Sequence, residues 1–143
     1  MRLRIPKYEN IKALNYEYLD RTVSQYYKPL LRSAMRKRLK MARKLLGDNK
    51  VDKILDTGYG GGTFLLELST RCNNLYGIDI HSEEEAVQAM LTQEGISAVL
   101  SQASILNIPY PDAFFDRVVC MSVLEHLVGE ELKKSNRGDE TGI

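Results

Sequence analysis

Residues 54–62 read Ile-Leu-Asp-Thr-Gly-Tyr-Gly-Gly-Gly, an apolar run that ends in Asp56 and turns at once into glycines. The helix-like run Thr63-Phe-Leu-Leu-Glu-Leu follows directly. A glycine turn lets backbone N–H groups approach a ligand without interference from Cβ atoms. The helix start beyond it adds unpaired N–H donors and a partial positive charge. The stretch therefore predicts a pocket for an adenosine-type cofactor at the carboxyl end of the first strand.

From residue 51 onward, short apolar segments alternate with helix-like ones. Strands are expected over residues 51–56, 74–80, 96–100 and 115–121. Helices are expected over residues 63–70 and 82–93, and from about residue 123. Ser82 and Glu85 have the spacing of a capping box at the start of the second of these helices. Strands alternating with helices imply an α/β fold with a Rossmann-like parallel sheet of about four strands.

The first third of the chain reads as helical instead. Apolar residues recur at three- and four-residue spacing from Leu31 to Leu46, which is one face of a helix. Pro29 suits the first turn of that helix and Gly47 its end. An earlier helix is expected around residues 10–27. The predicted organisation is an N-terminal helical segment (1–47), a Rossmann-like domain (48–128) and a polar tail (129–143).

The formal net charge of +1 conceals a division along the chain. Residues 1–50 carry fourteen Lys/Arg against four Asp/Glu, whereas residues 51–143 carry six against fifteen. Residues 28–44 hold eight basic residues and no acidic one. Such a run fits an anionic partner, either nucleic acid or lipid headgroups. A solvated helix face is the favoured interpretation, because no aromatic residue interleaves with the basic ones, so nucleic acid is a less favoured partner.

Size and composition describe one ordinary globular domain of 143 residues. No apolar run approaches the roughly 18–20 residues that span a bilayer, so no membrane span is predicted. The first six residues lack the apolar core of a secretory signal, and a cytoplasmic location is expected. Cys72 and Cys120 have neither metal-ligand nor redox spacing, so no metal site is predicted.

Two cofactor classes place a glycine turn after the first strand. The dinucleotide fingerprint is G-x-G-x-x-G. Counted from Gly58 it requires a glycine where the chain has Thr63, and counted from Gly60 it requires one where the chain has Leu65. Neither register fits, so a dinucleotide cofactor is disfavoured.

The ordered motifs instead resemble those of the class I S-adenosylmethionine-dependent methyltransferases. Leu55-Asp-Thr-Gly-Tyr-Gly-Gly-Gly resembles their first motif, and Gly77-Ile-Asp-Ile their second. Residues 102–116 are similar to the region that leads into their fourth strand, and residues 122–127 to the segment after it in relatives resembling quinone-biosynthesis C-methyltransferases. Asp79 follows Gly58 by 21 residues, about the distance that a βαβ unit sets for a ribose-binding carboxylate.

The resemblance implies roles at the methionine and ribose parts of the cofactor S-adenosyl-L-methionine. Asp56 would hold the ammonium group, directly or through water. Gly58, Gly60 and Gly62 would admit the methionine part and its carboxylate against the turn. Asp79 would accept hydrogen bonds from both ribose hydroxyls. A strand-end or helix-capping carboxylate is the alternative for Asp79, and ribose binding is favoured over it.

The resemblance also assigns residues to the adenine. Ile80 would pack on the ring, and the backbone N–H of Ile105 would meet adenine N1. Where the relatives carry an Asp for the adenine amino group, this chain has Ser104. An uncharged acceptor implies adenine binding weaker by on the order of 1 kcal/mol. His81, close by in the sequence, is expected at the surface.

The sequence offers no catalytic dyad, only two weak catalytic candidates. His126 would lie near the ligand crevice, because loops after parallel strands face it; a packed histidine is the favoured alternative. Tyr27, with Tyr26, would form part of a lid, although packing explains both tyrosines equally well. For Glu125, a functional role and a role in capping a helix together with Ser122 are equally favoured. Methyl transfer needs alignment and exclusion of water more than a general base, so the missing dyad does not argue against an enzyme.

The leading hypothesis is an enzyme, a methyltransferase that uses S-adenosyl-L-methionine on a small-molecule acceptor. The alternatives are a non-catalytic cofactor-binding fragment or subunit that needs a partner chain, a nucleic-acid adaptor acting through residues 28–44 and, least favoured, a dinucleotide-dependent oxidoreductase. The family fold has seven strands and four are found here, which predicts a truncated or split methyltransferase. Its open fourth-strand edge is expected to recruit a second copy or a partner chain.

Overall fold

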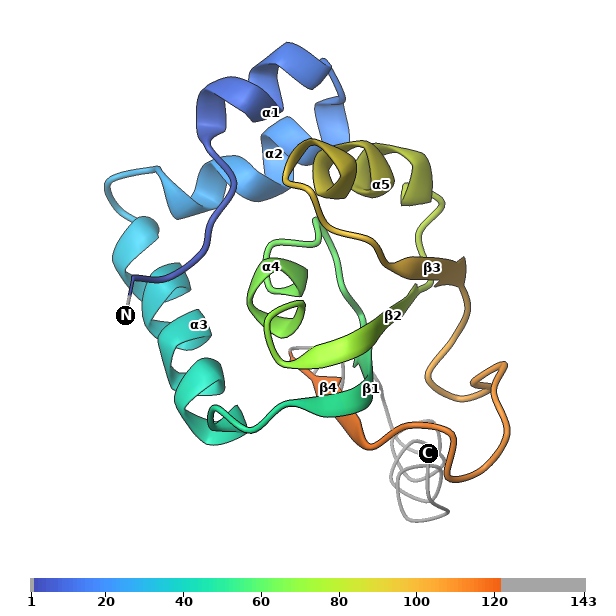
Figure 1. Cartoon of the computed structure of the whole chain (residues 1–143). Helices are drawn as coiled ribbons and strands as arrows, with labels where there is room; N and C mark the ends of the chain where they lie inside the picture. Colours follow the sequence, from blue (N-terminus) through green and yellow to red (C-terminus); the bar gives the residue numbers. More distant parts are fainter. Residues whose placement is uncertain (1, 122–143) are drawn as a thin grey trace.

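A computed structural model describes residues 2–121, and its centre is a four-stranded sheet. The strands lie in the order β3-β2-β1-β4, and every neighbouring pair is parallel (Figure 1). They are β1 (Val51–Thr57), β2 (Cys72–Asp79), β3 (Val99–Gln102) and β4 (Arg117–Cys120). The predicted α/β class with a partial Rossmann-like sheet is confirmed, and each strand overlaps its predicted range.

The N-terminal helices differ from their predictions in two details. They are α1 (Tyr8–Leu14), α2 (Glu17–Val23), the 3₁₀ turn η1 (Ser24–Tyr26) and α3 (Arg32–Leu46). The single helix predicted over residues 10–27 is wrong, because Asn15 adopts a left-handed conformation (φ 59°) that ends α1. Pro29 lies in the turn before α3 rather than in its first helical turn, whereas Gly47 (φ 72°) ends α3 as predicted.

The two helices between the strands are shorter than predicted. They are α4 (Leu65–Leu68) and α5 (Glu84–Gln93). The predicted capping box at the start of α5 is wrong, because no side chain of the N-cap residue Glu83 caps the helix and Ser82 lies outside it. Instead, the backbone N–H of Glu83 donates to Nδ1 of His81 at 3.0 Å. A histidine ring thus takes the place in which the pattern predicted a serine hydroxyl.

Both faces of the sheet are buried. On one face Ile54 joins the main core, which includes residues of all three N-terminal helices together with α4 and α5. On the other face Leu55 and Ile78 pack against aromatic residues of the connection between β3 and β4. The rings of Tyr110, Phe114 and Phe115 in this connection and of Tyr76 in β2 lie 5.0–5.6 Å apart, centroid to centroid. Burial on both faces explains the nearly continuous apolar strands.

The strand order creates one point at which the chain reverses direction across the sheet. From β1 the chain builds β2 and then β3 on one side, and it crosses back to place β4 on the other side of β1. Thr57 at the end of β1 donates its hydroxyl to the carbonyl of Val119 in β4, at 2.9 Å. In open parallel sheets the crevice beyond the carboxyl ends at such a reversal is the usual ligand site.

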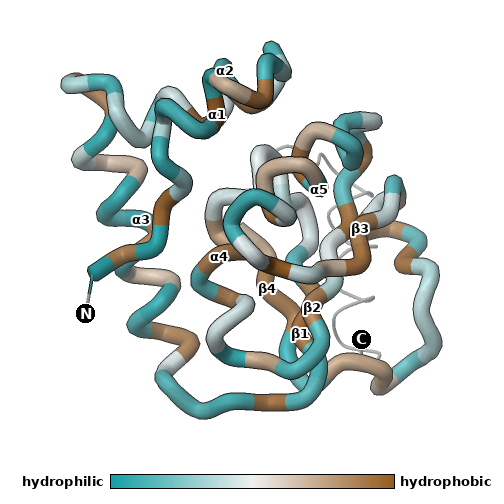
Figure 2. The backbone as a smooth tube through the Cα atoms, turned by 45° about the horizontal axis from the view of Figure 1, so that its top comes forward, coloured by the Kyte–Doolittle hydropathy of each residue, from teal (hydrophilic) through white to brown (hydrophobic). Residues whose placement is uncertain are grey.

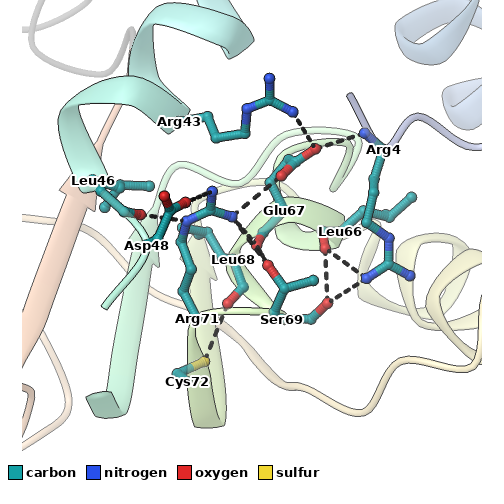
Figure 3. A network of polar contacts seen from close by, with 12 residues as sticks. Arg4, Arg43, Leu46, Asp48, Leu66, Glu67, Leu68, Ser69, Arg71 and Cys72 are labelled. Carbon is teal, nitrogen blue, oxygen red and sulfur yellow. Dashed lines mark hydrogen bonds and ion pairs between the residues drawn. The ribbon is translucent and has the colours of Figure 1, made fainter. Parts of the chain in front are cut away.

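A buried ionic network joins the N-terminal segment and α3 to the sheet domain (Figure 3). At its centre Glu67 of α4, only 1% exposed, receives the backbone N–H of Arg4 at 2.6 Å. The guanidinium of Arg71 reaches its carboxylate at 3.2 Å, and that of Arg43 in α3 at 3.7 Å. Arg71 also donates to the carbonyl of Gly47 at 2.8 Å. The network therefore fixes where α3 lies relative to α4 and to the start of β2.

Several predictions fall beyond residue 121. The helix expected from about residue 123, with Glu125 and His126, and the polar tail lie outside the described residues. Within residues 2–121, no group of histidine, cysteine and acidic side chains is arranged to hold a metal ion. Over the same residues, no helix combines the length and the apolar character needed to cross a bilayer.

Candidate functional site

A cavity of about 220 Å³ lies at the reversal point of the sheet. Its floor is the end of β1 and the glycine turn, and Met121 borders it just after β4. The N-terminal helices supply the opposite wall, with Thr22, Gln25, Tyr26, Met35, Arg38 and Leu39. The cavity therefore combines the predicted turn with residues of the N-terminal helices, which lie far from it along the chain.

Asp56 is the predicted residue whose surroundings are most unusual. It lines the cavity and is only 3% exposed. Among residues 2–121 no hydrogen bond or ion pair reaches its carboxylate, although buried carboxylates are normally paired. Burial first, and the nearby charge of Asp79 second, raise the pKa of Asp56 to about 8. Burial disfavours the ionised form of Asp56. A cationic ligand beside the side chain would favour that ionised form and would be stabilised by its negative charge.

Some backbone N–H groups of the glycine turn already donate to carbonyl groups of the protein. The N–H of Gly58 donates to the Ile78 carbonyl at 2.7 Å, and that of Gly62 to the Tyr59 carbonyl at 2.8 Å. The N–H groups of Tyr59 and Gly61 have no acceptor within residues 2–121. Only part of the turn is therefore free to donate to a ligand.

The glycines of the turn also differ in what surrounds them. A Cβ on Gly60 (φ 55°) would meet nothing within 4 Å, so this residue leaves open space. A Cβ on Gly62 (φ 81°) would lie 2.6 Å from Val87 of α5, and one on Gly61 would lie 2.5 Å from the hydroxyl of Thr22 in α2. Gly62 thus allows close helix packing, whereas Gly58 and Gly60 border the cavity.

Asp79 and His81 hold the glycine turn from the end of β2. The carboxylate of Asp79 accepts the N–H of Gly60 at 2.8 Å and the N–H of His81 at 3.3 Å. The ring Nε2 of His81 lies 3.0 Å from the Gly60 carbonyl. Because Nδ1 accepts the Glu83 N–H, Nε2 carries the proton and donates to that carbonyl. The turn and the carboxylate 21 residues later are therefore in direct contact.

The expectation that His81 lies at the surface is wrong. Its side chain is 17% exposed. The ring packs 4.9 Å from that of Tyr18 in α2 and 5.1 Å from that of Tyr59. The capping-box pattern concealed this role, because it assigned the start of α5 to Ser82 instead.

The residues predicted to meet adenine lie at the ends of β2 and β3 and do not line the cavity. Ile80 is 73% exposed directly after Asp79. Ser104 follows β3, and its hydroxyl oxygen accepts the N–H of Leu106 at 3.1 Å. Ile105 is 7% exposed, and its N–H has no acceptor within the described part of the chain. These residues are joined to the cavity through the contact between Asp79 and Gly60.

The two lid candidates have separate positions. Tyr26 lines the cavity, and burial raises the pKa of its hydroxyl. Tyr27 does not line it: its hydroxyl donates to the carbonyl of Pro6, and its ring stacks on Tyr8 with centroids 5.6 Å apart. The guanidinium of Arg36 lies over the Tyr27 ring at 5.3 Å. Of the two tyrosines, only Tyr26 is placed beside the predicted site.

Arg38 is a site residue that the sequence did not reveal. It lies on α3 within the basic run, and it lines the same cavity as Asp56. Seven other basic residues surround it between positions 28 and 44, so composition alone could not distinguish it. Arg38 follows Met35, which also lines the cavity, by three residues, so the two lie on one side of α3.

The side chains of the site fit the parts of an adenosyl-amino-acid cofactor. A carboxylate offers about four acceptor positions, and Asp79 uses two of them on backbone N–H groups, so two remain for a pair of ribose hydroxyls. Asp56 lacks a cationic partner, and Ile80 presents an exposed apolar side chain beside Asp79. Gly60 leaves room where any other residue would place a Cβ.

Comparison with known sequences identifies one family. The family model described as "Methyltransferase domain" matches residues 55–137, more than half of the chain. The match begins at the glycine turn and includes both β2 and β4. No curated protein sequence matches this chain.

Solved structures share the fold, and two of the three described here are methyltransferases. The YcgJ protein from Bacillus subtilis superposes with a TM-score of 0.67 at 22% identity, over 74% of this chain and 45% of that one. The N-methyltransferase NodS from Bradyrhizobium japonicum, in complex with S-adenosyl-L-homocysteine, gives 0.65 at 18% identity, over 95% of this chain and 67% of that one. A methyltransferase from Clostridium acetobutylicum gives 0.60 at 16% identity, over 92% and 48%. The chain thus spans less than half the length of two of these three relatives.

Proposed function

Because the chain belongs to the methyltransferase-domain family, we propose that it binds S-adenosyl-L-methionine across the carboxyl ends of β1, β2 and β3 and transfers the methyl group to a small-molecule acceptor. S-adenosyl-L-methionine is the methyl donor of the class I family, whose partial Rossmann-like sheet this chain has. When bound, this group supplies a methyl on a positively charged sulfur, which is already activated for in-line displacement. The protein's task is then alignment and exclusion of water.

The observation that carries the proposal is the buried carboxylate of Asp56, which has no partner among residues 2–121. A carboxylate 3% exposed at the edge of a cavity is costly unless a cation or donors reach it. The ammonium group of the cofactor's amino-acid part supplies both charge and N–H donors. Asp56 is therefore the residue that we assign to this group.

Arg38 completes the binding of the amino-acid part in this proposal. Arg38 lines the same cavity, and guanidinium groups bind carboxylates in a planar, two-pronged arrangement. Asp56 and Arg38 would then bind the opposite charges of the amino-acid end. At the other end Asp79 would bind the ribose, and Ile80, Ser104 and Ile105 the adenine.

The acceptor side is the wall of the cavity formed by the N-terminal helices. Met35, Leu39, Tyr26 and Gln25 line it, and they combine apolar surface with two polar groups. Apolar surface with a few polar groups is typical of sites for small molecules. These side chains exclude water and orient the acceptor, and Tyr26 is the closest candidate for contact with it.

Calorimetric titration of the full chain with S-adenosylhomocysteine tests the cofactor assignment. Wild-type binding is expected, and Asp79→Ala is expected to weaken it by roughly 100-fold, because it removes two charge-assisted hydrogen bonds. Asp112→Ala, an exposed carboxylate away from the strand ends, is the matched control. A folded wild-type chain that gives no heat would leave only a fold resemblance.

A second reading, in which a partner chain is needed for activity, is supported by the edge of the sheet. Within residues 2–121, β4 pairs with β1 alone and its other edge has no strand. An open apolar edge favours addition of a strand from another chain. Methyl transfer by a purified monomer would exclude this reading, whereas a solution mass of twice the chain would support a homodimer.

A further inference from the structure

The turn before α3 and the first half of that helix expose an unusual combination of side chains. We define this surface, the α3 tip, by Leu30, Leu31, Arg32, Lys37 and Lys40. In Figure 1 it lies at the outer side of the molecule, away from the sheet. Figure 2 shows α3 as mostly hydrophilic, with hydrophobic segments interspersed.

Two consecutive leucines of the α3 tip are in water. Leu30 is 94% exposed and Leu31 44%, although leucine is normally a buried residue. No buried cluster of the described chain includes either leucine. Further along α3, Met41 and Leu45 are 58% and 83% exposed. The helix thus presents apolar side chains to solvent in addition to the face that packs on the core.

The cations of the α3 tip surround a surface hollow of about 490 Å³. It is lined by Arg32, Ser33, Arg36, Lys37 and Lys40. Over residues 2–121, no ion pair joins any of these cations to an acidic side chain. Within this part of the chain, the acidic half therefore does not neutralise the surface through direct ion pairs.

Arg36 keeps the hollow attached to the folded N-terminal helices. Its Nε donates to the carbonyl of Tyr26 at 3.0 Å, and its guanidinium lies over the Tyr27 ring. Lys37 and Lys40 are three residues apart, so they lie on one side of the helix. The cations are therefore presented together on a fixed surface.

From these contacts we infer that the α3 tip docks on an anionic lipid bilayer. Cationic side chains around a hollow complement lipid phosphate groups, and each lysine or arginine adds attraction to an anionic leaflet. Leu30 and Leu31 enter the boundary between headgroups and acyl chains. A nucleic acid explains the cations equally well but leaves two exposed leucines with no role. The neighbouring aromatic ring, that of Tyr27, is already stacked on Tyr8 and lies under the Arg36 guanidinium, so it is not open for stacking on bases.

Docking also has a consequence for the candidate site. The same helix supplies Met35, Arg38 and Leu39 to the cavity. A chain held on a bilayer through α3 therefore has its cavity close to the lipid surface. The inference goes beyond methyl transfer and does not depend on it, because the α3 tip shares no residue with the cofactor-binding set.

Vesicle sedimentation of the full chain tests the inference. The chain is expected to bind phosphatidylcholine vesicles that contain about a third phosphatidylserine and not pure phosphatidylcholine vesicles, and to release as salt rises. Lys37→Gln with Lys40→Gln is expected to lower the partition coefficient roughly 10-fold or more. Leu30→Ser with Leu31→Ser is expected to lower it about 10-fold. All four residues are exposed, so circular dichroism should show an unchanged fold.

A control double variant removes the same number of positive charges as Lys37→Gln with Lys40→Gln, but elsewhere in the chain. Lys12→Gln with Lys50→Gln removes two exposed lysines outside α3 and is expected to change the partition coefficient by less than 2-fold, roughly. Equal loss in this control would show that net charge alone drives binding, and would overturn the assignment to the α3 tip. Binding that survives the leucine changes would overturn insertion into a bilayer. Binding of an oligonucleotide or of inorganic phosphate without vesicle binding would also overturn it.

Discussion

Two almost fully buried carboxylates lie in this molecule in opposite surroundings. Glu67, 1% exposed, receives the backbone N–H of Arg4 and contacts the guanidinium groups of Arg43 and Arg71 (Figure 3). Asp56, 3% exposed, has no such partner among residues 2–121. The first carboxylate is neutralised by the protein itself. The second is left for a ligand, which is how a binding site differs from a structural contact.

The difference follows from where each residue lies along its element. Glu67 faces away from the carboxyl ends of the strands, toward the N-terminal segment and the turn after α3. Asp56 lies near the end of β1, where parallel strands leave a crevice that helices do not fill. Pairing a buried charge stabilises the fold, whereas an unpaired one lowers stability in exchange for binding.

Removing the paired carboxylate should have the largest effect. Glu67→Ala leaves Arg71, which is 4% exposed, without its buried counter-charge. The free energy of unfolding is expected to fall by about 3–5 kcal/mol, as measured by urea denaturation. Asp48→Ala is the control, since Asp48 contacts the same arginine at 3.6 Å from a 96% exposed side chain; its effect is expected to stay below about 1 kcal/mol. Equal losses in the two variants would break the comparison.

Neutralising the unpaired carboxylate should act in the opposite direction. The pKa of Asp56 is about 8 in the folded chain, against 3.8 as the ordinary value. Between these pH values the folded state keeps a proton that the unfolded state has lost, so the free energy of unfolding falls as pH rises from about 4 to about 8. Asp56→Asn abolishes this decline. At pH 8 it should be more stable than wild type by about 1 kcal/mol or more, and at pH 4 nearly equal to it.

The same substitution should weaken cofactor binding while it stabilises the fold. S-adenosylhomocysteine affinity at pH 8 is expected to fall roughly 10- to 100-fold, because one charge-assisted interaction is lost. Asp112→Asn, an exposed carboxylate, should change neither quantity. A variant that loses stability at pH 8 would show that Asp56 is paired after all.

The smallest effect is expected at Tyr59, whose hydroxyl is buried without a hydrogen-bond partner in the described chain. Burial and the nearby acidic residues raise the pKa of this hydroxyl further above its ordinary value. Tyr59→Phe keeps the ring contacts and should raise the free energy of unfolding by up to about 1 kcal/mol. Tyr8→Phe is the contrast, because the Tyr8 hydroxyl donates to Asp20 at 2.8 Å, and the loss of this bond should lower the free energy of unfolding. The opposite order would contradict the distinction between paired and unpaired polar groups.

Much of the fold could be predicted because its signals are local. The alternation of apolar strands with helical segments, the turn at Gly58–Gly62 and the stop at Gly47 each depend on neighbouring residues. The errors were local too, where two signals competed. Asn15 interrupted a helical pattern by adopting a left-handed conformation, and His81 displaced Ser82 at the start of α5.

The candidate site could be predicted only in part. The sequence singled out Asp56, the glycines and Asp79, because their spacing is set within one βαβ unit. It did not reveal Arg38, which lies on α3, 18 residues before Asp56 along the chain, and lines the same cavity. It also did not separate Tyr26, which lines the cavity, from Tyr27, which packs on Tyr8.

By itself, the sequence determined the parallel α/β architecture and the residues at the first turn, because periodicity and glycine content act over a few positions. Only the tertiary structure decided which of those residues have partners. In the folded chain Gly60 borders open space, whereas Val87 packs against Gly62. Glu67 has three partners, and Asp56 has none among the described residues. These contacts depend on helices from distant parts of the chain. Periodicity can be read from a few neighbouring residues, whereas packing is defined only once all the elements have come together.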